Sequence, residues 1–333
     1  MWNLKITAAI PAYNCADTIR ETLDSVLCQT VQPDEILVVN DGSTDETPSI
    51  LESYRPRITV ITQNNRGLGG ARDVLCRHAQ GDLVAFLDAD DLWHPRYLEV
   101  QRRLFLEHPE CVSFFVGHVN FCGDFNYQWE WEDQPWAPQI MPPADFLRRI
   151  NWAPAPFGMS YCCIPKTILS RMGPEPFRLR LTEDFYSHCR RAPLGPVLYL
   201  PLALAAYRVR PGSLSSNTLR ISGAMTQGLE SLEEFYEEHA APDLRRTFRE
   251  ALALNRRHYA KLLLGAGDTA KARGQLMRSV ACCRKPISVA KSLAVLALSY
   301  MPGPLQPMWP SALREGETAG SRANLQTHNG GDL

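Results

Sequence analysis

Short apolar runs alternate with amphipathic and polar stretches along the first hundred residues. The runs at 4–10, 35–39, 58–61 and 83–87 have the length and composition of buried strands, and Pro11 is expected to end the first. A capping box of Thr18 and Glu21 precedes one predicted helix, and a second is expected over 46–54. Strands that alternate with helices predict an α/β fold whose central sheet is mostly parallel and flanked by helices.

The pattern changes after residue 110 and again after residue 217. A helix over 97–108 is followed by predicted strands at 111–119 and 198–207, and residues 219–284 follow helical spacing. We therefore expect one domain over 1–217, with a nucleotide-binding half (1–110) and an acceptor half (111–217). A basic helical C-terminal region should occupy 218–310. The small polar residues of 311–333 predict a disordered tail.

Composition is that of an ordinary soluble protein, but charge is distributed unevenly. The 333 residues are 45% hydrophobic and carry a net charge of -1. Residues 1–242 hold 21 basic and 30 acidic side chains, whereas residues 243–333 hold 14 and 6. The ten cysteines form no C-x-x-C pair, and no signal peptide is recognised at the N-terminus. Reduced thiols in a cytoplasmic protein are the expectation, with no zinc site.

Three carboxylates follow directly on the fourth predicted strand, at Asp88, Asp90 and Asp91. Unpaired carboxylates are costly to bury, so they should lie where the strand emerges at the carboxyl edge of the sheet. Side chains alternate along a strand, so Asp88 and Asp90 should point the same way and offer oxygen ligands to a divalent cation. The alternative is that the acids cap the helix that begins near Pro95.

Polar residues also follow the other predicted strands. Because parallel strands end at one edge of a sheet, the following residues are expected to cluster: Tyr13, Asp41, Asn65, Asp88 and Asp90. Arg72, in the helix after the glycine-rich 67–70 stretch, could face the same crevice.

Two further stretches each allow two interpretations. Glu183 and Asp184 open a predicted helix, where acids favour the helix dipole, but a carboxylate near a substrate hydroxyl also serves as a general base. Residues 128–143 are rich in tryptophan and proline (Trp129, Trp131, Pro135, Trp136, Pro138). This stretch is either an ordinary loop with buried rings or an aromatic wall for an acceptor sugar or lipid.

The C-terminal helices are also open to two interpretations. Their arginines and lysines could form a solvated face. The apolar stretch 287–301 is short for a membrane span and is interrupted by Lys291. It is either a packing helix or an interfacial helix attracted to anionic lipid.

The ordered motifs resemble the inverting family 2 glycosyltransferases, which have the Rossmann-like GT-A fold. The resemblance runs from about residue 7 to 216 and rests on an ordered set of motifs: Pro11-Ala12-Tyr13-Asn14, Asn40-Asp41-Gly42-Ser43-Thr44-Asp45, Ala71-Arg72, Phe86-Leu87-Asp88-Ala89-Asp90-Asp91, Glu183-Asp184 and Tyr207-Arg208. Each motif alone is weak, but the order is specific.

The resemblance implies roles for these residues. A nucleotide-sugar would be bound by Pro11, Ala12, Tyr13, Asn14, Asp41, Asn65, Arg72, Asp88 and Ala89. Asp88 and Asp90 would hold Mg or Mn on the diphosphate, and Asp184, beside Glu183, would take the proton of the acceptor hydroxyl. Asp73 replaces the family's usual asparagine and would make the pocket more acidic. No Gln-x-x-Arg-Trp motif occurs, which favours addition of a single sugar.

The expected function is transfer from a nucleotide-diphosphate-sugar, with a UDP-sugar as the leading donor, to a hydroxyl of a glycan or lipid-linked acceptor. Cell-surface polysaccharide or glycolipid synthesis at the inner face of the membrane fits this expectation, with no nucleic-acid partner. A nucleotidyltransferase is one alternative. Such an enzyme typically has a glycine-rich loop with a basic residue after the first strand, and residues 11–14 lack one. A non-catalytic sugar-nucleotide-binding protein is the other, and the intact acidic set argues against it.

Overall fold

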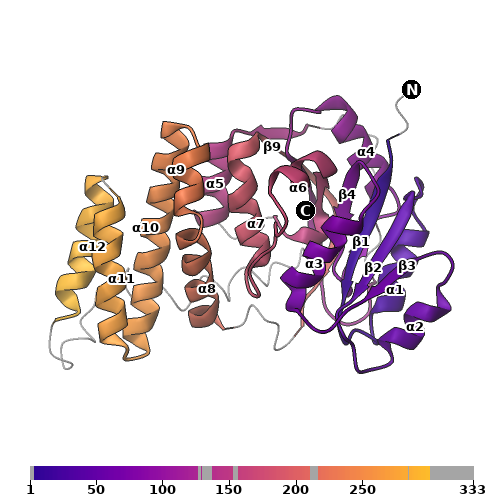
Figure 1. Ribbon diagram of the computed structural model, residues 1–333, viewed down its shortest axis with the longest axis horizontal. Helices are drawn as coiled ribbons and strands as arrows, with labels where there is room; N and C mark the ends of the chain where they lie inside the picture. The colour runs from indigo at the N-terminus through magenta and orange to yellow at the C-terminus, as the bar shows by residue number, and fades with distance from the viewer. Residues whose placement is uncertain are drawn as a thin grey trace, which may run out of the picture. The chain divides into compact units, whose positions relative to one another are not determined.

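The computed structural model describes residues 4–126, 129, 137–152, 157–210, 217–283 and 285–300. Its central feature is a nine-stranded sheet with neighbour order β3-β2-β1-β4-β8-β6-β9-β5, in which β7 also pairs with β9. Figure 1 shows β1, β2 and β3 side by side. The strands are β1 (Ile6–Ala12), β2 (Glu35–Asn40), β3 (Thr59–Thr62), β4 (Leu83–Phe86), β5 (Leu92–Trp93), β6 (Ser113–Phe121), β7 (Gln139–Met141), β8 (Cys162–Pro165) and β9 (Val197–Arg208).

The first four strands form the parallel half of the sheet, as the apolar runs predict. β1 pairs in parallel with β2 and β4, and β2 pairs in parallel with β3. Along β1, Ile6, Ala8 and Ile10 enter one buried cluster, whereas Ala9 enters a second cluster on the opposite face. The carboxyl ends of these strands therefore share one edge.

Pro11 does not end β1 as the sequence predicts, because the strand continues to Ala12 and Pro11 pairs with Val39. The Ala9 carbonyl accepts a hydrogen bond from Leu87 N, so odd-numbered backbone groups of β1 face β4. β4 ends at Phe86, opposite Ala9. A backbone N–H at position 11 would point beyond the end of β4. Proline, which lacks this N–H, therefore costs the sheet no hydrogen bond here.

The second half of the sheet is mixed and contains strands that the sequence pattern does not predict. β8 lies antiparallel between β4 and β6, while β6 and β9 are parallel with a register shift around Gly117. β5 and β7 both pair antiparallel with β9. β5, β7 and β8 have two, three and four residues, too short for a clear period in the sequence.

Helices cover both faces of the sheet. Apolar residues of α1, α2 and α4 join the cluster on one face, and those of α3, α5 and α6 join the cluster on the other. These helices and those that follow are α1 (Ile19–Leu27), α2 (Thr47–Ser53), α3 (Gly67–His78), α4 (Tyr97–Glu107), α5 (Pro143–Trp152), α6 (Lys166–Arg171), α7 (Glu183–Arg191), α8 (Thr218–Glu230), α9 (Glu233–His239), α10 (Pro242–Gly265), α11 (Thr269–Cys282) and α12 (Pro286–Leu298).

The chain divides into two compact units. The first comprises Met1–Ser216 and Gln227–Thr247, and the second comprises Asn217–Thr226 and Phe248–Leu333. Residues 227–247, which the sequence groups with the C-terminal region, thus belong to the first unit. No helix in the described ranges combines the length and apolar character that crossing a membrane requires.

Candidate active site

The acidic loop after β4 is fixed by hydrogen bonds from other elements. Ser160 Oγ accepts from the Asp88 backbone N–H at 3.1 Å, and Thr18 Oγ1 donates to the Ala89 carbonyl at 2.8 Å. Thr18 makes no side-chain cap on α1, so the predicted capping box is wrong. Its partner Glu21 instead pairs with Arg208 at the end of β9. Thr18 therefore holds the acidic loop, and Glu21 holds the end of β9.

Asp91 is the anchor of this loop rather than a helix cap. Its side chain is fully buried, and its Oδ1 accepts from the Arg208 backbone N–H at 2.8 Å. Burial, together with the charges of Asp90 and Asp88, raises the pKa of Asp91 well above its ordinary value. The capping interpretation is therefore wrong for this acid, and α4 has no side-chain cap at its N-terminus.

Asp88 and Asp90 keep part of their carboxylates accessible, at 28% and 37% side-chain exposure. Asp90 Oδ2 lies 3.5 Å from Arg210 Nε, and burial plus the charge of Asp88 raises the pKa of Asp90. Within the described ranges, no three side chains of His, Cys, Asp or Glu gather into a metal site. Asp88 and Asp90 supply two carboxylates, and an ion of the Mg type takes one or two carboxylates and completes its shell with phosphate oxygens and water.

Arg72 connects the acidic loop to the start of α7. Its side chain is 2% exposed, its Nη2 lies 2.5 Å from Asp88 Oδ1, and its Nη1 pairs with Glu183. The carboxylates raise the pKa of Arg72 above its ordinary value. The guanidinium thus joins the acidic loop to Glu183, which lies 111 residues after Arg72 in the sequence.

Gly69 explains how α3 approaches closely enough for this contact. A Cβ at this position would come within 2.3 Å of the carbonyl oxygens of Phe177 and Leu179. Asp73, one turn further along α3, is buried, and its Oδ1 accepts from the Phe177 N–H at 2.9 Å. From the sequence, Asp73 is expected to make the nucleotide pocket more acidic. In the structure its carboxylate instead accepts a hydrogen bond from the backbone at Phe177. Burial raises its pKa to about 6.

Asp184 lies in the first turn of α7, beside Glu183. Its Oδ1 accepts from the Phe185 N–H at 2.6 Å, and burial raises the pKa of Asp184 although Arg72 opposes this effect. Burial likewise raises the pKa of Glu183 to about 7. Glu183 is occupied by Arg72, so Asp184 is the better placed of the two to meet a substrate hydroxyl.

The loops that would hold the nucleotide are joined to one another. Asn14, at φ 46°, accepts from the Thr44 N–H through Oδ1 at 2.8 Å. Asp41 Oδ1 accepts from Gln63 Nε2 at 2.6 Å and from the Arg66 N–H at 2.9 Å. Loops after β1, β2 and β3 thus form one continuous rim.

The remaining predicted nucleotide residues differ in access. Tyr13 is 51% exposed and Asn65 is exposed. Pro11 and Ala12 are buried within β1, and Ala89 is nearly buried. Tyr13 and Asn65 therefore present side chains at this rim, whereas the other three can contribute chiefly backbone and shape.

Three aromatic residues that the sequence gives no role lie beside the acids. His118 on β6 stacks on Tyr161 with ring centroids 4.2 Å apart, and Tyr207 on β9 meets His118 edge-on at 6.3 Å. Tyr207 is 37% exposed, and burial together with Asp91, Asp88, Asp90 and Asp184 raises its pKa to about 12. The Tyr207-Arg208 motif in the sequence indicates the position of Tyr207. No motif in the neighbouring sequence indicates that His118 or Tyr161 belongs to the site.

The tryptophan-rich stretch is described only in part. Trp129 packs edge-on against His94 at 5.0 Å and lies 5.1 Å from the Phe125 ring. Trp131, Pro135 and Trp136 lie outside the described residues.

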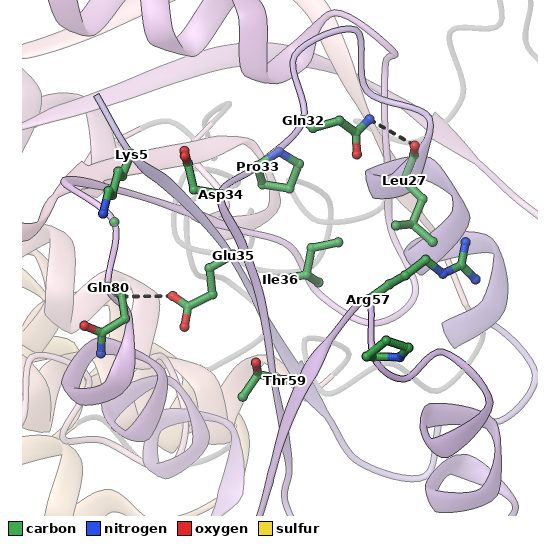
Figure 2. A pocket seen from close by; sticks show the side chains of 12 residues that line it. Lys5, Leu27, Gln32, Pro33, Asp34, Glu35, Ile36, Arg57, Thr59 and Gln80 are labelled. Carbon is green, nitrogen blue, oxygen red and sulfur yellow. Dashed lines mark hydrogen bonds between the residues drawn. The ribbon is translucent and has the colours of Figure 1, made fainter. Parts of the chain in front are cut away.

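A hollow of about 690 Å³ lies at the opposite, amino edge of the sheet (Figure 2). Figure 2 shows Lys5, Glu35 and Thr59 around it, at the starts of their strands. Glu35 Oε2 already accepts from Thr7 Oγ1 and from the Gln80 N–H. Because open parallel sheets bind ligands at their carboxyl edge, this hollow is not the candidate site.

Comparison with known proteins bears on the family and the fold. The profile of the family described as Glycosyl transferase family 2 matches residues 7–169. The chain is 30% identical to Glycosyltransferase GlyA of Streptococcus pneumoniae over 233 residues, which are 63% of this chain and 31% of GlyA.

It is 40% identical over 90 residues to the UDP-Glc:alpha-D-GlcNAc-diphosphoundecaprenol beta-1,3-glucosyltransferase WfaP of Escherichia coli, covering 26% of this chain and 36% of WfaP. The alignments thus span about a third of each relative's length.

The fold is similar to that of S. aureus TarS 1-349, solved in complex with UDP-GlcNAc. The TM-score is 0.65 at 19% identity, and the match covers 89% of each chain. At this identity the likeness concerns the fold alone.

Proposed function

Because the chain belongs to glycosyltransferase family 2, we propose that it transfers a sugar from a nucleotide-diphosphate-sugar to an acceptor hydroxyl with inversion. One observation carries this proposal: Arg72 pairs with both Asp88 and Glu183, so the loop suited to the diphosphate is joined to the first turn of α7, where Asp184 follows Glu183. Such a site needs both halves of the reaction close together.

On the donor side, we assign Tyr13, Asn14, Asp41 and Asn65 to the nucleotide, with Pro11, Ala12 and Ala89 shaping the pocket, whereas Arg72, at 2% exposure, acts by positioning Asp88. The name of WfaP contains UDP-Glc, which supports a UDP-sugar as donor. Asp88 and Asp90 would hold Mg or Mn, which when bound neutralises charge on the leaving diphosphate.

On the acceptor side, Asp184 takes the proton of the attacking hydroxyl. The hydroxyl oxygen bonds to the anomeric carbon as the carbon–oxygen bond to the diphosphate breaks, and the electron pair of that bond leaves with the diphosphate. Burial raises the pKa of Asp184, which makes its carboxylate a stronger proton acceptor at the moment of attack. Attack from the face opposite the leaving group inverts the anomeric configuration.

We further propose that one sugar is added per acceptor and that the acceptor is a glycan or lipid-linked glycan of cell-surface synthesis. The diphosphoundecaprenol acceptor in the name of WfaP supports the lipid-linked class. Such an acceptor places the enzyme at the cytoplasmic face of the membrane.

A product assay tests the proposal. The purified chain is incubated with a panel of UDP-sugars and Mn²⁺, with a polyprenyl-diphosphate-linked sugar as acceptor, and UDP and the extended acceptor are measured. Formation of both in equal amounts supports the proposal. Pyrophosphate release from a nucleoside triphosphate and a sugar phosphate would instead indicate a nucleotidyltransferase. Tight UDP-sugar binding without transfer would indicate a binding protein.

A further inference from the structure

The hydroxyl groups of α12 face the protein. Ser292 is fully buried, and its Oγ lies 2.9 Å from Ser279 Oγ on α11. Arg257 Nη1 on α10 donates to Ser288 Oγ at 3.2 Å and to Ser292 Oγ at 3.3 Å. Just beyond the helix, Arg273 Nε donates to Ser299 Oγ at 3.3 Å. The inner side of α12 therefore combines these polar contacts with apolar packing, in which Val295 and Leu296 contact a cluster that includes Leu276.

The outer side of α12 is apolar. Ile287 is 60% exposed and Leu293 is 48% exposed. We define the α12 outer face as the exposed residues Ile287, Ala290, Leu293, Ala294 and Ala297. Four of them follow helical spacing at 287, 290, 294 and 297 and so form one stripe. Since Val295 and Leu296 already pack inward, α12 is apolar on its outer side as well as on its inner side.

Exposed apolar side chains are concentrated in this part of the chain. Eight large hydrophobic residues are exposed in the described ranges, and four lie within residues 277–300: Met277, Ile287, Leu293 and Tyr300. Scattered exposed hydrophobics are ordinary, but a concentration of them marks an interaction surface.

The charges on these helices are of one sign. α11 carries Lys271, Arg273 and Arg278, α12 carries Lys291, and neither helix contains Asp or Glu. Lys291 is exposed and lies on the same side of α12 as Ala290 and Ala294. An apolar stripe accompanied only by cations matches the boundary of an anionic bilayer, where acyl chains lie below negative headgroups.

We propose that the α12 outer face inserts its apolar side chains into an anionic lipid surface, with Lys291 at the level of the headgroups. A second copy of this chain is a poorer occupant, because it would bring cationic helices against one another. This inference extends the membrane location given under the proposed function. It rests on the proposed function because membrane binding serves the enzyme only if the acceptor is linked to lipid. Lipid binding itself does not require sugar transfer.

Vesicle flotation of the full chain tests this surface. Phosphatidylcholine vesicles are compared with vesicles that contain phosphatidylglycerol, for the wild type and an Ile287→Glu/Leu293→Glu variant. The matched control is Leu106→Glu/Ile140→Glu, which places the same charges at exposed apolar residues of the first unit. Thermal unfolding and light scattering establish that each variant is folded and report its oligomeric state.

We expect the wild type and the control to float with anionic vesicles and the Ile287→Glu/Leu293→Glu variant to partition at least tenfold less. No binding of the wild type, or equal binding of all three folded proteins, would overturn the inference. A wild-type oligomer that this variant disperses, without vesicle binding, would identify a second copy as the occupant and overturn it too. Transfer to a short water-soluble acceptor should be unchanged in the variant. Loss of transfer in every protein, with lipid binding intact, would reject the proposed function and leave the surface standing.

Discussion

The Nη2 atom of Arg72 lies 2.5 Å from Oδ1 of Asp88, and the same guanidinium pairs through Nη1 with Glu183. The arginine is nearly inaccessible to water, so both ion pairs form in a medium of low polarity. It therefore positions the acidic loop relative to the first turn of α7.

Arg72→Lys should lower kcat for sugar transfer by about 10²-fold, since an ammonium cannot make the two divergent pairs of a guanidinium. UDP release at saturating substrates measures the effect. The control is Arg66→Lys, because Arg66 is exposed and reaches Asp41 through its backbone N–H. Wild-type turnover in Arg72→Lys would show that the double pairing is dispensable.

Asp73→Asn should stabilise the fold at neutral and alkaline pH. The pKa of Asp73 is about 6 in the folded chain against an ordinary 3.8, so the folded state binds a proton more tightly than the unfolded state. The buried charge therefore costs stability above pH 6, and this cost disappears as the pH falls below about 4.

Asparagine keeps an oxygen for the Phe177 N–H and removes the charge. We expect a gain of about 1–2 kcal/mol at pH 8, a few degrees in Tm, and almost none at pH 4. Thermal unfolding at the two pH values measures this difference. A variant less stable than the wild type at pH 8 would refute the assignment of the cost to the Asp73 charge.

Asp90→Ala should weaken metal-dependent donor binding. Removing one of two carboxylates leaves the ion held by Asp88 alone, so the Kd for UDP with Mn²⁺ should rise at least tenfold by calorimetry. Asp124→Ala, which removes an exposed acid, is the control. If binding in Asp90→Ala equals that of the wild type both with Mn²⁺ and with EDTA, the metal assignment is wrong.

Tyr13 and Tyr207 should separate the donor from the acceptor. Tyr207→Ala should raise KM for the acceptor about tenfold, and more than KM for the donor, because its exposed ring lies on β9, in the half of the domain assigned to the acceptor, and an aromatic face is worth about 1 kcal/mol. Tyr13→Ala should instead raise KM for the donor more than KM for the acceptor. Initial rates with each substrate varied in turn measure both constants. Equal effects of Tyr207→Ala on the two constants would contradict this division.

The parallel half of the fold follows from the sequence because each of its strands is a short apolar run that ends in polar residues. Asp88 and Asp90 stand out for the same reason, since charged groups directly after a buried strand need a partner, whereas the role of Asp184 is implied only by the family resemblance. Motif order then identifies the family.

Other features depend on contacts that no local pattern records. The role of Thr18 could not be predicted because its hydroxyl serves the Ala89 carbonyl, 71 residues away, rather than its own helix. His118 and Tyr161 meet only because β6 and β8 pair antiparallel. For α12 the sequence leaves a packing helix and an interfacial helix open, because an apolar segment does not show which of its side chains are exposed.

The most direct test of the shared site is Asp184→Asn, assayed in parallel for donor binding and for transfer. The amide oxygen can still accept from the Phe185 N–H, but it cannot take the hydroxyl proton. We predict a Kd for the UDP-sugar within about twofold of wild type and a fall in transfer of about 10²–10⁴-fold. Turnover near the wild-type rate would contradict the account, because Asp184, next to the Glu183 that Arg72 joins to the donor loop, would then have no part in the reaction.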